Sequence, residues 1–166
     1  MHVRPVAALL GPMLLAACGA VVDPNTPPRV VEVVDGDTVV VNVAGRDEAV
    51  RLIGVDTPET KHPSKPVECY GPEASEFTAR VLPRGTEVRL ERDVEARDHF
   101  GRLLVYVYRA ADGAFVNLEL VRRGFGRPLT IAPNDAHAGE FARAGREARD
   151  QRWGLWQACE TGDDVE

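Results

Sequence analysis

The most constraining feature of the sequence is a β-rich stretch between residues 29 and 55, in which short apolar runs alternate with turn residues. Val, Ile and Thr dominate these runs, and such side chains suit a pleated, half-buried surface. We expect three strands, at residues 29–34, 38–43 and 49–55. A tight turn at Asp35-Gly36 separates the first two, and a hairpin turn at 44–47 separates the second from the third. The folded part of the chain therefore begins as β-structure.

Helices and two further strands follow. Gly71-Pro72-Glu73 predicts a helix start, because Pro is favoured in the first turn and an acid suits the positive end of the helix dipole. Strands are expected at 86–90 and 103–108, with a charged connection at 91–102 between them.

The C-terminal part is predicted to be helical. A short helix at 116–123 should end at Gly124, and Asn134 or Asp135 should cap a last helix that runs to about Gln151. We then expect the C-terminus to be docked by two tryptophans, Trp153 and Trp156.

This order of elements favours one fold class. At 166 residues the chain suits a single domain with a real core. We predict one mainly β, α+β domain at residues 29–157. The OB-fold, a five-stranded antiparallel β-barrel with three helices around it, satisfies the order of elements well. From the pattern alone, an open α+β sheet is an alternative.

The N-terminus has the features of a targeting segment. Arg4 precedes an apolar run at 6–17 that is shorter than the roughly 20 residues a membrane span needs. Residues 15–19 resemble a bacterial lipobox, which predicts a signal peptide at 1–17, cleavage before a lipidated Cys18, and a linker at 18–28. We expect an exported cell-envelope lipoprotein anchored to a membrane through Cys18; plain secretion and a cytosolic location are the alternatives.

The three cysteines fit this interpretation. If Cys18 carries lipid, Cys69 and Cys159 are left as a pair in an oxidising compartment, where disulfides persist. Two separate buried thiols are the alternative. The net charge of −6 argues against a general nucleic-acid binder, but four of the acidic residues lie in a predicted acidic tail at 158–166.

One short stretch, residues 51–59, carries several chemically capable side chains. Arg51 offers a planar fork suited to phosphate, and Asp56 and Glu59 offer carboxylates suited to a hard cation or to proton transfer. Asp56-Thr57-Pro58 is also ordinary turn chemistry, so this stretch alone does not decide between a site and a surface turn.

Two other segments strengthen the case for a site. Asp35-Gly36-Asp37 places two carboxylates around a glycine, and Arg102 follows Gly101, which permits close backbone approach. Two Asp carboxylates with a backbone carbonyl suit Ca²⁺ or Mg²⁺, a further carboxylate could act on water, and two arginines could bind a phosphodiester. Together these groups predict phosphodiester hydrolysis.

Longer motifs resemble the staphylococcal nuclease family across residues 30–156. The similarity is strongest at 55–63 and 70–74, and the Asp-Gly-Asp-Thr, Phe-Gly-Arg and Trp-Gly-Leu-Trp segments occur in the family's order. The resemblance implies an OB-fold barrel and a Ca²⁺-dependent endonuclease that cuts DNA and RNA to 3′-phosphate products.

The resemblance also implies individual roles. Asp37 and Asp56 would bind Ca²⁺ through their carboxylates, and Thr57 through its backbone carbonyl. Glu59 matches the general base proposed for the family. The remaining matched residues contact substrate: Arg51 and Arg102 as catalytic phosphate-binding arginines, and Lys65 as a loop lysine.

The chain departs from the family where nucleotides are recognised. Leu129-Thr130-Ile131 stands where the founding member has tyrosines, and His99-Phe100 replaces a Lys-Tyr pair. Phe100 could still stack on a base, and stacking on aromatic rings is worth about 1–3 kcal/mol per base. We expect a monomer that prefers single-stranded or unpaired substrate; the alternative is a non-catalytic OB-fold nucleic-acid-binding module.

Overall fold

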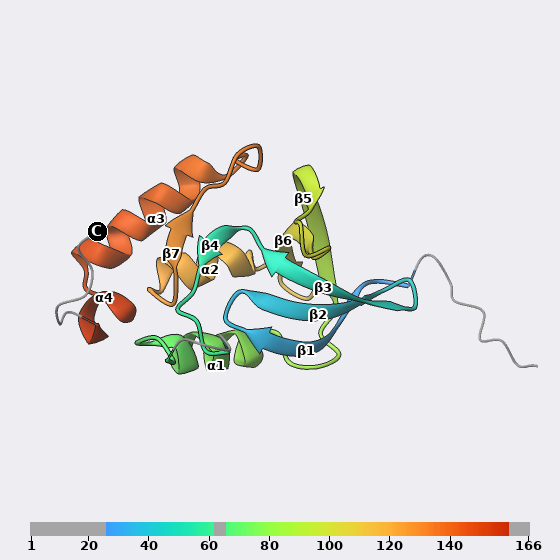
Figure 1. Ribbon diagram of the computed structural model, residues 1–166, viewed down its shortest axis with the longest axis horizontal. Coiled ribbons are helices and arrows are strands. Elements are labelled where there is room, and N and C mark those ends of the chain that lie inside the picture. Colours follow the sequence, from blue (N-terminus) through green and yellow to red (C-terminus); the bar gives the residue numbers. More distant parts are fainter. Residues whose placement is uncertain (1–25, 62–65, 160–166) are drawn as a thin grey trace, which may run out of the picture.

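A barrel of strands with helices packed against it makes up the protein (Figure 1). The structure, a computed structural model, describes residues 26–61 and 66–159. The strands are β1 (Arg29–Asp35), β2 (Thr38–Val43), β3 (Arg46–Leu52), β4 (Gly54–Asp56), β5 (Val88–Arg97), β6 (Leu103–Arg109) and β7 (Arg127–Leu129). The helices are α1 (Gly71–Val81), α2 (Val116–Arg122), α3 (Ala138–Asp150) and α4 (Leu155–Ala158).

The main sheet has the strand order β1-β2-β3-β6-β5 and closes on itself. Closure comes from the start of β1 against the segment leading into β5, where Arg29 bridges Glu87 and the Val30 N–H donates to the Thr86 carbonyl at 2.9 Å. The result is the predicted OB-fold-like barrel.

One strand pairing differs from the antiparallel prediction. The β1–β2, β2–β3 and β5–β6 pairs are antiparallel, but β3 and β6 run parallel, with Arg51 opposite Leu104. The cause is geometric: strands that alternate in direction around a closed ring must be even in number. A closed barrel of five strands therefore needs a parallel seam, and here it lies between β3 and β6.

Small apolar side chains from alternate positions along the strands fill the barrel. Val39 and Val41 of β2 are fully buried, as are Val50 and Leu52 of β3, because successive side chains of a strand point to opposite faces. The helices complete the core with larger groups, among them Leu120 of α2 and Phe141 of α3.

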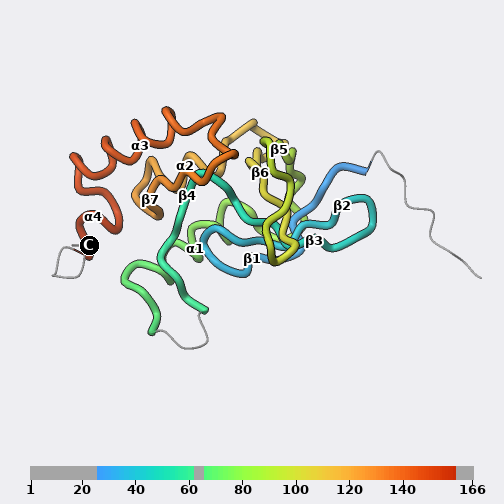
Figure 2. The backbone as a smooth tube through the Cα atoms, turned by 45° about the horizontal axis from the view of Figure 1, so that its top comes forward, coloured from blue at the N-terminus to red at the C-terminus, as the bar shows by residue number. Residues whose placement is uncertain are grey.

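The predicted strand at 49–55 is broken in two. Gly54 has a φ of +84°, and a Cβ atom there would lie 2.3 Å from the ring of Phe141. The chain therefore leaves the barrel after Leu52, and β4 pairs with β7 instead. In Figure 2 this segment runs from the barrel strands past the C-terminal helices and then down toward α1. The break places residues 55–59 between the barrel strands and the C-terminal helices.

Strand β5 is longer than predicted and continues to Arg97, through part of the expected charged connection at 91–102. Charged side chains are tolerated there because most residues of β5 are exposed or only partly buried. The pairing of β5 with β6 is irregular between Arg92 and Arg97.

The last long helix starts later than predicted. Its N-cap is His137, so neither Asn134 nor Asp135 has that role. Asn134 is buried instead, and its side-chain amide donates to the Glu95 carbonyl and accepts from the Glu95 N–H at 3.1 and 2.8 Å. This amide joins the loop before α3 to β5.

The C-terminus is docked mainly by Leu155, which is 2% exposed, whereas Trp153 is 43% exposed. Trp156 is partly buried between the guanidinium groups of Arg127 and Arg149. Among the helices within 26–61 and 66–159, none is long and apolar enough to cross a bilayer.

The crowding at Gly54 gives a stability prediction. Gly54→Ala should lower the free energy of unfolding by about 3 kcal/mol, because the methyl group meets Phe141 and the backbone is left-handed. Gly113 is a matched control, since its φ is +71° and a Cβ atom there would meet no other atom within 4 Å. Gly113→Ala should cost only about 1 kcal/mol in urea denaturation. Equal losses in the two variants would contradict the crowding at Gly54.

Candidate active site

Asp37 lies in the turn between β1 and β2 and is 7% exposed. Its Oδ2 accepts hydrogen bonds from the Thr57 N–H at 2.9 Å and the Thr57 hydroxyl at 3.0 Å. The turn can approach Thr57 this closely because residue 36 is glycine: a Cβ atom there would lie 2.6 Å from the Thr57 Oγ1. Asp37 and Thr57 are thus joined through the N–H and hydroxyl of Thr57, while the predicted role of the Thr57 carbonyl stays a prediction.

Arg51 spans the break between β3 and β4. Its Nη1 donates to the carbonyls of Leu52 and Val55 at 2.8 and 2.9 Å and lies 3.1 Å from the Oδ2 of Asp37. Its Nη2 donates to the Oδ1 of Asp56 at 3.0 Å. One guanidinium therefore contacts both predicted calcium carboxylates and two carbonyls of the bent backbone.

Asp56 is the more exposed member of the carboxylate pair, with 58% of its side chain accessible. Its pKa is raised, first by loss of hydration against the protein and then by the charges of Asp37 and Glu68, while Arg51 opposes the shift.

The donor set suits a hard divalent cation. Carboxylate and carbonyl oxygens are the ligands that Ca²⁺ prefers, and Asp37 and Asp56 are already arranged around one positive group, the Arg51 guanidinium. Within the described ranges, no cluster of three or more His, Cys, Asp or Glu side chains is arranged to hold a metal. The predicted ligand set has two carboxylates, with a backbone carbonyl and water.

Glu59 lies in the loop between β4 and α1. Its Oε1 accepts from the N–H groups of Thr60 and Lys61 at 2.9 and 2.7 Å, so its carboxylate caps its own turn. The Glu59 N–H donates to Glu68 Oε2 at 3.0 Å.

Asp35 is a further site residue, and the sequence motifs assign it no role. Burial alone would raise the pKa of its carboxyl, but hydrogen bonds with Glu59, with Thr60 and with the Gly36 N–H hold that pKa below its usual value. The Oδ1 of Asp35 accepts from the Thr60 hydroxyl at 2.8 Å, so Asp35 joins the β1–β2 turn to the loop that carries Glu59.

Arg102 is ordered by Asp98. The Nε of Arg102 donates to Asp98 Oδ2 at 2.7 Å, and Asp98 Oδ1 accepts from the backbone N–H groups of Phe100 and Arg102 at 3.0 and 2.9 Å. These bonds keep the pKa of Asp98 low against the opposing effect of burial. The predicted substrate residue Phe100 is 72% exposed, with its ring 5.3 Å from the Arg102 guanidinium.

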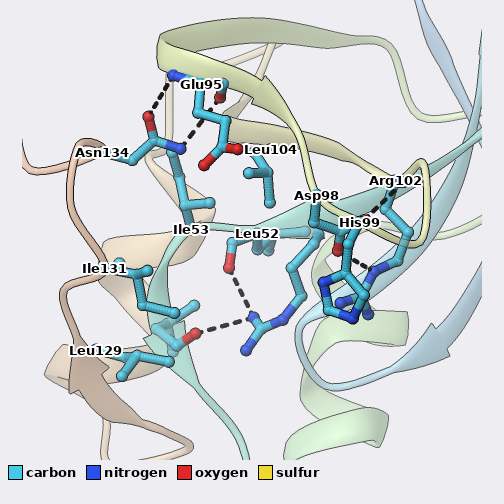
Figure 3. Close-up of a pocket in the computed structure, with 13 residues that line it drawn as sticks. Leu52, Ile53, Glu95, Asp98, His99, Arg102, Leu104, Leu129, Ile131 and Asn134 are labelled. Carbon is cyan, nitrogen blue, oxygen red and sulfur yellow. Dashed lines mark hydrogen bonds and ion pairs between the residues drawn. The ribbon is translucent and has the colours of Figure 1, made fainter.

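A cavity of 410 Å³ brings the two arginines together (Figure 3). Arg51 and Arg102 both line it, and the β3–β6 seam is what places them side by side. His99 points into the same space, whereas Phe100 is not among the lining residues. The opposite wall is aliphatic, formed by Leu129 and Ile131.

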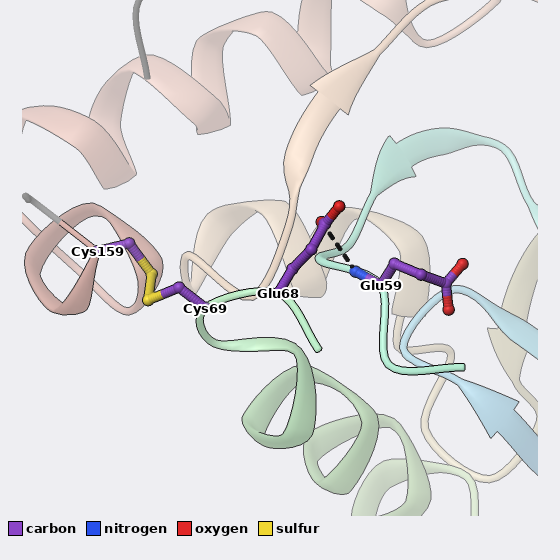
Figure 4. The surroundings of a disulfide bond; sticks show 4 residues. All are labelled: Glu59, Glu68, Cys69 and Cys159. Carbon is purple, nitrogen blue, oxygen red and sulfur yellow. Dashed lines mark hydrogen bonds between the residues drawn. A yellow bond between two sulfur atoms is a disulfide. The ribbon is translucent and has the colours of Figure 1, made fainter. Parts of the chain in front are cut away.

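Two of the three cysteines are joined: Cys69 and Cys159 form a disulfide with a Cα–Cα distance of 5.9 Å (Figure 4). These are the two cysteines that the sequence predicts to be a pair. Lys65 and Cys18 lie outside the described residues, as do the predicted signal peptide and most of the acidic tail.

Comparison with known proteins identifies the family. The family model described as "Staphylococcal nuclease homologue" matches residues 49–158. The chain belongs to the staphylococcal nuclease family. Within the matched range of this family lie Arg51, Asp56, Glu59 and Arg102, while Asp37 precedes it.

Individual relatives in the staphylococcal nuclease family cover most of the chain. Thermonuclease of Staphylococcus intermedius is 43% identical over 125 residues, which is 75% of this chain and 73% of the relative. Thermonuclease of Staphylococcus hyicus is 38% identical over 77% of this chain and 74% of its own length. Endonuclease YncB of Bacillus subtilis is 37% identical over 74% of this chain and 58% of its own length.

The contacts of Asp37 predict a structural effect in the absence of metal. Asp37→Ala should lower the free energy of unfolding by about 2–3 kcal/mol, because buried groups of Thr57 lose their acceptor. Asp56→Ala is the matched control and should cost less than about 1 kcal/mol, since its ion pair is exposed. Denaturation in excess chelator measures both. A loss at Asp56 as large as that at Asp37 would contradict the described hydrogen bonding.

Proposed function

We propose that this protein is a Ca²⁺-dependent endonuclease that hydrolyses the phosphodiester bonds of DNA and RNA. Relatives named thermonuclease and endonuclease support a nuclease function. The observation that carries the proposal is the position of Arg51. It contacts Asp37 and Asp56 while lining the same cavity as Arg102.

The two arginines act on the phosphate. A guanidinium offers a planar fork of N–H donors that matches two phosphate oxygens, and charge builds up on those oxygens as water attacks phosphorus. Arg102 has its Nε on Asp98, so its orientation is set before substrate arrives. Arg51 is likewise oriented by two backbone carbonyls. Such pre-organisation is what makes a donor effective in the transition state.

Glu59 is proposed to accept the proton of the attacking water. A carboxylate can do so if it lies within hydrogen-bond reach of that water. Cleavage of the bond to the 5′-oxygen would leave a 3′-phosphate, as the family resemblance implies.

Asp37, Asp56 and the carbonyl of Thr57 are the proposed ligands of the cation. A bound Ca²⁺ would supply Lewis-acid stabilisation of a phosphate oxygen. The raised pKa of Asp56 is consistent with this assignment, because a cation favours the charged carboxylate.

The aliphatic wall shapes our proposal for substrate choice. Leu129 and Ile131 offer apolar contact to a base but no aromatic face. The base should therefore bind more weakly here than in a site with an aromatic side chain, where stacking contributes about 1–3 kcal/mol. Phe100 and Lys65 are the proposed further contacts. We propose that single-stranded or unpaired nucleic acid is preferred and that the protein acts as a monomer.

Nicking of supercoiled plasmid tests the function. The purified protein should convert plasmid to open-circular and linear forms with Ca²⁺ and lose this activity in EGTA. Glu59→Gln should reduce the rate by about 10²-fold or more, since general-base catalysis contributes 10²–10⁴-fold. Binding of plasmid without metal-dependent cleavage would instead identify a non-catalytic nucleic-acid-binding module.

We also propose that the protein is exported and anchored in the cell envelope through lipid on Cys18. The supporting observations are the lipobox-like residues 15–19 and the Cys69–Cys159 disulfide, which suits an oxidising compartment.

Fractionation of cells that produce the full chain tests the anchor. The protein should be found in the membrane fraction and incorporate labelled fatty acid, whereas Cys18→Ser should abolish labelling and release the protein. Cys69→Ser is the control for loss of a cysteine and should still be labelled. Membrane retention of Cys18→Ser at the wild-type level would contradict lipid anchoring.

A further inference from the structure

Glu68 lies in the loop before α1 and makes two reciprocal hydrogen bonds with Glu59 (Figure 4). The Glu59 N–H donates to Glu68 Oε2 at 3.0 Å, and the Glu68 N–H donates to the Glu59 carbonyl at 2.9 Å. Both polar backbone groups of Glu59 are therefore bound by the same residue.

The start of α1 closes the other side of the Glu59 backbone. The Gly71 N–H donates to the Glu68 carbonyl at 3.1 Å, and a Cβ atom on Gly71 would lie 3.2 Å from the Glu59 carbonyl oxygen. The backbone of Glu59 thus lies between Glu68 and the first residue of a helix.

Little apolar packing holds Glu68 itself in place. Residues 66–69 are exposed, and Val67 has 58% of its surface accessible. A segment with few buried contacts opens easily, so its local stability depends on the links that it does make. The covalent link is at the next residue, Cys69.

Cys159, the other cysteine of the disulfide, lies next to a packed helix. Cys159 directly follows α4, whose Leu155 is 2% exposed and donates its N–H to the Gly124 carbonyl at 2.8 Å. The disulfide therefore connects the exposed loop to a packed element 90 residues away in the sequence.

We infer that Glu68 is a positioning residue for Glu59, and that the Cys69–Cys159 disulfide makes this positioning depend on the oxidised state of the protein. The inference rests on the proposed function, in which Glu59 acts on the attacking water. Glu68 itself contacts no reacting atom. A displacement of about 1 Å in a catalytic group can cost about 10²-fold in rate, so loss of this support slows the reaction.

Reduction by a dithiol is the chemical event that removes the link. The dithiol transfers two electrons and two protons to the disulfide, the S–S bond breaks, Cys69 and Cys159 become thiols, and the dithiol closes to its own disulfide. The protein then hydrolyses substrate slowly in a reducing compartment and at its full rate in an oxidising one.

Substitution of Glu68 in the oxidised protein gives the first test. Glu68→Ala should lower kcat at least about tenfold with KM unchanged, whereas Glu68→Gln, which keeps an acceptor oxygen, should restore kcat to within about threefold of the wild type. Glu76→Ala, an exposed acid on α1, is the matched control and should leave kcat unchanged. The melting temperature should be similar in all three variants.

Two outcomes would overturn the role of Glu68. One is a kcat for Glu68→Ala close to that of the wild type. The other is a Glu68→Gln variant as slow as Glu68→Ala with a shifted Ca²⁺ titration, because that result would mean that Glu68 acts through its charge on the cation.

A double-mutant cycle tests the disulfide. Cys69→Ser/Cys159→Ser should lower kcat, and adding Glu68→Ala should lower it little further, because both changes act on Glu59. Losses that multiply would refute the link between the disulfide and Glu68. Removing a disulfide also lowers stability, so the assays are run well below the melting temperature of each variant.

Amide hydrogen exchange separates this inference from the proposed function. The Glu59 and Glu68 N–H groups should exchange faster in the reduced protein and in Cys69→Ser/Cys159→Ser, while amides of β2 stay protected. An oxidised wild type without nuclease activity would refute the proposed function, and unchanged exchange at Glu59 would refute the coupling to the disulfide.

Discussion

The guanidinium of Arg51 is the group on which the rest of the site depends. The chain turns out of the barrel at Gly54, and this turn exposes backbone carbonyls that would otherwise pair within a strand. Arg51 binds two of them while contacting Asp37 and Asp56. The Arg51 guanidinium thus provides hydrogen bonds to the carbonyls of the bent backbone and offsets the charge of two carboxylates. The fold and the site therefore depend on the same side chain.

Glycines allow the neighbouring segments to come close enough for this arrangement. A Cβ at residue 36 would collide with Thr57, and one at residue 126 would lie 2.9 Å from the Asp56 carbonyl oxygen. The β1–β2 turn and the start of β7 therefore press on Asp56-Thr57 from different sides. Backbone packing thus brings together the residues that the side-chain contacts of Arg51 then join.

Local patterns predicted the strands well, because alternating Val residues have the period of a half-buried strand. The same runs hid the break at Gly54, since residues 49–55 are apolar apart from Arg51 and the glycine itself. Asp35 and Glu68 were missed as site residues because their partners, Thr60 and Glu59, are joined to them by tertiary contacts. Residue chemistry suggested that Arg51 and Arg102 act together, but only the structure shows that both line one cavity.

The parallel seam between β3 and β6 has a consequence for how the protein folds. Arg51 belongs to a meander of local contacts, whereas Arg102 precedes β6, which pairs with β3 across the intervening α1 and β5. Pairings between distant segments are slow to form, because the ordering of the chain between them opposes them. Arg51 and Arg102 therefore come together late, and a chain whose barrel has not closed carries both arginines without the cavity that they line.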